Sequence, residues 1–136
     1  MLIILLGKNG SGKHTVMFEL VEKYRYLPFI SQDDEKIKEG KYVAVMDPNK
    51  AQRFISNRNR DNIVIAYISV SKDIRKKRIV RKDPAVKILW ESLTEMEDNN
   101  FSRKSVEDMI DITIYNDGRL QDTVSTLLYK ADRRNS

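Results

Sequence analysis

The fold is decided by residues 1–15, MLIILLGKNGSGKHT. The first six residues are apolar, and a short apolar run of this kind is typical of a buried strand. The segment from Gly7 to Gly12 predicts a loop, because glycine allows tight turns in which successive backbone N–H groups converge on an anion. A helix is expected from about Lys13, with its positive dipole end directed at that anion. This order predicts a phosphate-binding loop, and hence a nucleoside triphosphate as ligand.

The loop fits the pattern G-x-x-x-x-G-K-[S/T] at Gly7, Gly12 and Lys13, but His14 stands where a hydroxyl is usual and Thr15 follows it. That hydroxyl normally ligates Mg²⁺, which prefers oxygen ligands to imidazole. Either Thr15 or water fills the coordination position, or metal binding is weakened. The alternative is a glycine-rich turn without a ligand. It is less favoured because strand, loop and helix occur in the required order.

The composition is that of one globular domain spanning residues 1–136. The chain has no cysteine, which excludes disulfides and cysteine-bearing metal sites and suits a reducing cytosol. The opening apolar run is too short for a membrane span and lacks the charged start of a signal peptide. We therefore expect a cytoplasmic protein without membrane contact. The net charge of +5 favours anionic partners, although exposed lysines alone would give the same value.

Strands and helices are predicted to alternate along the chain. Strands are expected at 1–6, 27–30, 42–46, 62–70 and 111–115, and helices at 13–24, 49–56, 71–82, 85–97 and 120–131. Residues 31–40 are expected to form a loop with at most a turn of helix, and 98–100 a turn. A short helix is expected to start at Ser102 or Ser105, and 132–136 to fray.

This alternation predicts an α/β fold of three layers, in which a mostly parallel five-stranded sheet carries helices on both faces. In the helix at 85–97, a stripe at three- and four-residue steps is expected to face the sheet, with Trp90 filling the core beside it. The stripe consists of Val86, Leu89, Leu93 and Met96. The phosphate loop, Asp47, Ser71 and Asn116 all follow predicted strands and are expected at one edge of the sheet, where such folds bind ligands.

Three segments resemble the nucleoside monophosphate kinases of the P-loop class, and most closely guanylate kinase. They are the loop at 7–13, the strand and arginine-bearing helix at 63–81, and the strand at 110–117, which an aspartate opens and Asn-Asp closes. The resemblance implies an ATP-binding kinase that uses Mg²⁺ and phosphorylates a nucleoside monophosphate. It also implies that Asn116 contacts the adenine of ATP. Adenylate kinases have Gly-Thr after the loop lysine, so His14-Thr15 is compatible with phosphoryl transfer.

The acceptor side departs from guanylate kinases. Their long insertion between the second and third strands, whose serine, arginines and tyrosines hold the monophosphate, corresponds here only to residues 31–41. Ser31 aligns with the family's serine, but the following arginines are replaced by Gln32, Asp33, Asp34 and Glu35. The acceptor therefore stays open.

Three residues are predicted to act on the transferred phosphoryl group. Lys13 is expected to bridge the β- and γ-phosphates. Arg78 and Arg81 are expected to stabilise the equatorial oxygens of the transferred phosphoryl group from a closing lid. The spacing between these two arginines is one residue shorter than in the family. For most of the basic cluster at 75–82 the alternatives are a solvated helix face or, less favoured, contact with RNA or DNA phosphates.

Mg²⁺ is predicted to be held by Thr15, Asp47 and water, because Asp47 ends an apolar strand as the metal-positioning acid of such kinases does. Capping of the next helix explains Asp47 equally well. Asn116 likewise fits a strand-ending turn, since Asn-Asp-Gly is a turn sequence. The predicted nucleotide-binding residues are Gly7, Asn9, Gly10, Ser11, Gly12, Lys13, His14, Thr15 and Asn116.

Three functions remain open. The first is a small ATP-dependent kinase acting on a nucleoside monophosphate or another small acceptor. The second is a catalytically weak or inactive guanylate-kinase-like module that binds nucleotide or protein, favoured by the short acidic stretch at 31–41. The third is a nucleotide-gated nucleic-acid binder. The oligomeric state and the pathway are not encoded in these patterns.

Overall fold

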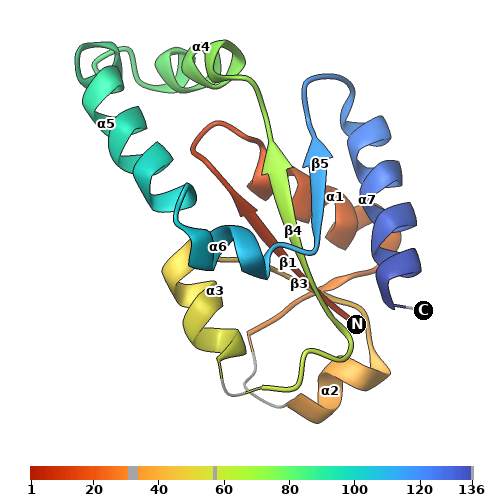
Figure 1. Cartoon of the computed structure of the whole chain (residues 1–136). Coiled ribbons are helices and arrows are strands. Elements are labelled where there is room, and N and C mark those ends of the chain that lie inside the picture. The colour runs from red at the N-terminus through yellow and green to blue at the C-terminus, as the bar shows by residue number, and fades with distance from the viewer. Residues whose placement is uncertain (31–33, 57, 136) are drawn as a thin grey trace.

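The computed structural model describes residues 1–30, 34–56 and 58–135, which contain a five-stranded parallel sheet of order β2-β3-β1-β4-β5 (Figure 1). The strands are β1 (Leu2–Gly7), β2 (Leu27–Pro28), β3 (Tyr42–Val45), β4 (Ile63–Ser69) and β5 (Ile112–Tyr115). Each neighbouring pair is parallel. The predicted sheet is confirmed.

The central strand β1 is buried on both faces, and its side chains alternate between two cores. Ile3 and Leu5 pack in the core that holds residues of α1 (Lys13–Tyr24) and α7 (Leu120–Asn135). Leu2, Ile4 and Leu6 pack in the other core. That core also holds residues of α2 (Asp34–Glu39), α3 (Pro48–Ile55) and α6 (Lys104–Met109). The predicted three layers are therefore confirmed, with helices on both faces (Figure 1).

Two further helices lie over the edge where the parallel strands end. The helix α4 (Lys72–Lys82) begins directly after β4, with the Ser71 hydroxyl accepting a hydrogen bond from Ile74 N as its N-cap. A short connection leads to α5 (Val86–Phe101), which returns toward α6 (Figure 1). In the part of the chain that the structure describes, no helix is both long and apolar enough to cross a bilayer.

Several predicted boundaries are wrong. The second strand spans only Leu27 and Pro28, although Phe29 N still donates to the Val43 carbonyl oxygen at 2.9 Å. Pro28 is tolerated because β2 lies at the sheet edge and the N–H groups on either side of it face β3. A helix, α2, occupies much of the expected loop, while residues 31–33 lie outside the described part. The turn expected at 98–100 is absent, since α5 continues to Phe101, whose ring packs against Tyr67. The expected frayed end is helical to Asn135.

The predicted inward stripe of α5 is also wrong. The side chains of Leu89, Leu93 and Met96 are 58%, 46% and 71% exposed, whereas Trp90 and Thr94 are buried. The confirmed part is the burial of Trp90. The helix instead presents to the rest of the protein the more polar stripe that contains Trp90 and Thr94.

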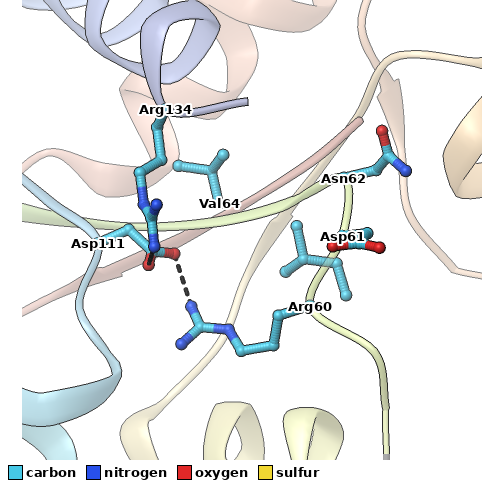
Figure 2. Close-up of a pocket in the computed structure, with 7 residues that line it drawn as sticks. Arg60, Asp61, Asn62, Val64, Asp111 and Arg134 are labelled. Carbon is cyan, nitrogen blue, oxygen red and sulfur yellow. Dashed lines mark hydrogen bonds and ion pairs between the residues drawn. The ribbon is translucent and has the colours of Figure 1, made fainter. Parts of the chain in front are cut away.

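A buried carboxylate ties α7 to the sheet on the side opposite the phosphate loop. Asp111, whose side chain is 7% exposed, accepts hydrogen bonds from Ile65 N at 2.8 Å and Arg60 Nη2 at 2.6 Å. It also accepts one from Arg134 Nη2 at 3.2 Å. Figure 2 shows both guanidinium groups converging on this carboxylate. The aspartate that opens the late strand is thus a structural anchor.

We expect Asp111→Ala to destabilise the protein by about 2 kcal/mol, because it leaves Ile65 N without its acceptor and Arg60 without its carboxylate partner. Chemical denaturation measures the change. The exposed Asp108→Ala is the matched control and should leave stability within about 0.5 kcal/mol of wild type. Equal stability of the two variants would contradict the anchoring role.

Tyr26 predicts a pH dependence of stability. Its side chain is 3% exposed in the core between the sheet, α1 and α7, and burial raises the pKa of the phenol to about 12. The native protein therefore keeps a proton that the unfolded chain loses near pH 10, so stability should be complete below pH 10 and fall as the pH rises toward 12. Tyr26→Phe should show a shallower fall over this range in unfolding titrations. Tyr129→Phe, an exposed control, should behave as wild type.

Candidate functional site

The turn between β1 and α1 is built on two glycines in the left-handed region, Gly10 at φ 83° and Gly12 at φ 85°. A Cβ on Gly10 would lie 2.9 Å from the Arg75 carbonyl oxygen, and one on Gly12 would lie 2.6 Å from Asn116 Nδ2. Only glycine satisfies both the backbone conformation and the contact at these positions. The loop therefore carries two neighbours packed directly against it, α4 and the end of β5.

The loop ends in an uncapped helix. Gly12 is the N-cap of α1 and has no side chain to bond the N–H groups of the first turn. These N–H groups begin at Lys13 and lie at the positive end of the helix dipole, which favours an anion. His14 and Thr15 are exposed there. The geometry is that of an anion cradle.

Lys13 lies within this cradle. Its Nζ donates to the Gly7 carbonyl oxygen at 2.6 Å, across the loop. Burial lowers the pKa of Lys13 below its usual value, and the Glu97 carboxylate partly offsets that shift. A half-buried ammonium of this kind gains stabilisation when a phosphate enters.

Asn116 braces the loop from the end of β5. The side chain is 6% exposed, and its Nδ2 donates to the Ser11 carbonyl oxygen at 2.8 Å. Its Oδ1 accepts a hydrogen bond from the Thr123 hydroxyl at 2.7 Å. The amide thus holds the loop to α7. The predicted contact with adenine stays a prediction.

The first of two cavities beside the loop contains the predicted lid arginines. Arg78 reaches the loop, donating to the Gly10 carbonyl oxygen at 2.9 Å and to the Asn116 carbonyl oxygen at 3.3 Å. Arg81 and Lys82 line the same cavity, which has a volume of about 380 Å³ and extends past Asn116 to Gly118 and Leu120. Positive charge therefore lies over one side of the loop.

The second cavity, also about 380 Å³, adjoins the first and shares Gly10, Gly12, Ile79 and Lys82 with it. Its walls are residues 8–15 together with the end of α4 and the start of α5, including Lys82, Val86 and Leu93. Thr15 lines both cavities. A polyphosphate that follows the loop N–H groups would run from the first cavity into the second.

The two predicted metal ligands, Thr15 and Asp47, have different surroundings in the structure. Thr15 offers a hydroxyl oxygen beside the loop, as Mg²⁺ prefers. Asp47 caps α3, accepting from Lys50 N at 2.8 Å, and its side chain is otherwise exposed. Among residues 1–30, 34–56 and 58–135, no three acidic or histidine side chains gather into a metal site. Coordination of Mg²⁺ by Thr15 and Asp47 therefore stays a prediction in which the nucleotide phosphates supply further oxygens.

Two acidic residues at the loop were missed in the sequence. Glu97 Oε2 accepts a hydrogen bond from the Asn9 backbone N–H at 2.8 Å, and Asp98 forms an ion pair with Lys8 at 2.6 Å. Glu97 is the last residue of the predicted helix, and Asp98 lies in the expected turn at 98–100, into which α5 continues. The sequence does contain a second helical stripe, formed by Trp90, Thr94, Glu97 and Phe101. Because two of its members are polar, the stripe does not resemble a buried face.

The basic cluster at 75–82 divides between two environments. Arg75 is 4% exposed, and its Nη1 lies 3.5 Å from Glu97 Oε1. Its guanidinium carbon lies 6.0 Å from the centre of the Trp90 ring. Lys77 and Arg81 are exposed. The cluster is therefore no uniform solvated face, and its predicted contact with nucleic acid stays a prediction.

Solved structures of kinases share this fold. A shikimate kinase from Acinetobacter baumannii, in complex with shikimate, is 16% identical, with TM-score 0.62 over 93% of this chain and 90% of that chain. A gluconokinase from Sinorhizobium meliloti is 14% identical, with TM-score 0.59 over 96% of this chain and 91% of that chain. An uncharacterised protein from Eubacterium ventriosum is 18% identical, with TM-score 0.69 over 97% and 98%. At these identities the likeness establishes the fold, which is that of P-loop kinases.

No protein-family model matches the sequence, and no curated protein does. The specific resemblance to guanylate kinase therefore stays a prediction. The site has to be interpreted from its own geometry.

The packing on the loop gives a direct test. We expect Gly12→Ala to destabilise the protein by at least about 2 kcal/mol, because alanine is strained at positive φ and its Cβ would displace Asn116. The control is Gly118→Ala, where a Cβ meets nothing within 4 Å. Thermal unfolding of the two variants measures the difference. A stable Gly12→Ala protein would show that the loop is not held as described.

Proposed function

We propose that this protein binds a nucleoside triphosphate on the loop at 7–15 and transfers its terminal phosphoryl group to a small acceptor. One observation carries the proposal: an uncapped helix start, two left-handed glycines and a half-buried Lys13 form one cradle. Backbone N–H groups and a lysine in this arrangement bind the phosphates of a nucleotide. The kinase fold supports the same conclusion.

The roles of the residues follow from their places. The loop N–H groups hold the phosphates, and Lys13 follows the charge that develops on the transferred group. Arg78 and Arg81 neutralise the phosphoryl oxygens from α4. Asn116 contacts the base, as the guanylate kinase likeness implies. Thr15 and Asp47, with water, would hold Mg²⁺, which would supply positive charge to the nucleotide phosphates.

The acceptor is a small molecule, and a nucleoside monophosphate is the first to try. The segment between β2 and β3 is short, residues 29–41, and its described part contains the six-residue helix α2. So short a segment supplies few groups for an acceptor. This observation favours a second candidate function, a module that binds nucleotide without turnover.

Calorimetry with Mg-ATP and Mg-GTP tests the binding step. We expect wild type to bind, and Lys13→Ala to bind at least about tenfold more weakly, because one phosphate-facing charge is lost. Lys23→Ala is the matched control, since Lys23 lies at the far end of the same helix and pairs with Glu19. Absence of heat with folded wild type would refute the proposal.

Release of ADP in the presence of a panel of monophosphates and other small hydroxyl compounds tests the transfer step. Turnover with one acceptor, lost in Lys13→Ala, supports the kinase. Binding without turnover across the panel supports the module. Steeply salt-dependent binding to oligonucleotides would instead favour the nucleic-acid binder.

A further inference from the structure

A carboxylate already occupies part of the phosphate cradle. The Asn9 N–H belongs to the glycine-rich loop, and it donates to Glu97 Oε2 at 2.8 Å. The electrostatic effect of Glu97 also reaches Lys13, whose pKa it raises against the effect of burial. Glu97 thus provides the cradle with a negative charge when no phosphate is bound.

The same carboxylate neutralises a buried arginine. Arg75 is 4% exposed, and its Nη1 lies 3.5 Å from Glu97 Oε1, a long contact for a charged pair. Its Nε is buried and has no hydrogen-bond partner among the described residues. A buried guanidinium with an unused donor is costly unless an anion completes its environment. Arg75 therefore has an unused hydrogen-bond donor. This donor lies near the loop, because the Arg75 backbone packs against Gly10.

We propose that the Asn9 N–H and Arg75 form the subsite for the terminal phosphate of a bound nucleoside triphosphate, and that Glu97 is the anion which this phosphate displaces. The inference rests on the proposed function and adds to it a discriminator between triphosphates and diphosphates.

The direction of the nucleotide supports this assignment. The cavity that contains Asn116 and Leu120 adjoins the cavity that contains Asn9, since both are lined by Gly10, Gly12, Thr15, Ile79 and Lys82. With the base in the first cavity, the phosphate furthest from the base reaches the second. A diphosphate is shorter by one phosphate and leaves Glu97 in place.

The displacement conserves charge at the subsite. Removing Glu97 alone would leave Arg75 as an uncompensated buried charge, which is strongly unfavourable. A phosphate that takes over both hydrogen-bond donors exchanges one anion for another. The phosphate has to compete with Glu97. The apparent affinity for the triphosphate is therefore the intrinsic affinity multiplied by the fraction of molecules in which Glu97 leaves the site open.

Glu97→Gln tests the competition, because glutamine keeps an oxygen acceptor for Asn9 but loses the negative charge. We expect this variant to bind Mg-ATP about tenfold more tightly than wild type and Mg-ADP within about twofold of wild type. Glu95→Gln, an exposed acid on the same helix, is the matched control and should change neither affinity. Calorimetry compares each of the two variants with wild type for Mg-ATP and for Mg-ADP.

Arg75→Gln tests the other half of the subsite and should weaken Mg-ATP to the affinity of Mg-ADP. If either Arg75→Gln or Glu97→Gln does not fold in thermal unfolding, the other variant decides, together with the fluorescence of wild type. Trp90 is the single tryptophan and lies beside Arg75, so its fluorescence should change when wild type binds Mg-ATP and stay constant with Mg-ADP.

The outcomes separate this inference from the proposed function. If wild type binds ATP but Glu97→Gln alters ATP and ADP affinities equally, or alters neither, the subsite is wrong and the nucleotide site stands. If folded wild type, Glu97→Gln and Glu95→Gln all bind no nucleotide, the proposed function is wrong and the subsite with it.

Discussion

The close packing on the loop between β1 and α1 is the constraint on which the rest of the site depends. Gly10 and Gly12 adopt conformations that other residues rarely take, and α4 and Asn116 fill the space that a side chain would need. This packing directs the start of α1 toward the two cavities and leaves its N–H groups without a capping side chain. The glycines serve the fold and the cradle by the same geometry.

The charges around this loop are arranged in compensating pairs. Lys8 pairs with Asp98, and Arg75 lies beside Glu97, so that α5 neutralises the positive charge that α4 and the loop bring together. Under the proposed function, Glu97 occupies the position that the terminal phosphate would take. Ligand binding then becomes an exchange of anions, which costs less than the creation of new buried charge.

Much of the fold could be predicted because its signals are local. The apolar run at 2–6, the glycines and the alternation of strands and helices specify a parallel sheet whose central strand is buried on both faces. The prediction was wrong in α5, where two helical stripes compete. The apolar stripe with Leu89 and Leu93 was preferred over the stripe with Trp90 and Glu97, although the second one faces inward. Periodicity indicates a face, but partners far away in sequence decide which face is buried.

The sequence by itself determined the cradle: the positions of its glycines, Lys13 and the strand and helix on either side are local features of backbone chemistry. The tertiary structure alone decided which distant side chains hold the loop. Asn116 reaches Ser11 across 105 positions of the chain, and Glu97 reaches Asn9 across 88. Such contacts arise only after β5 and α5 have packed against the loop, because a hydrogen bond depends on distance in space and leaves no periodic trace in the chain.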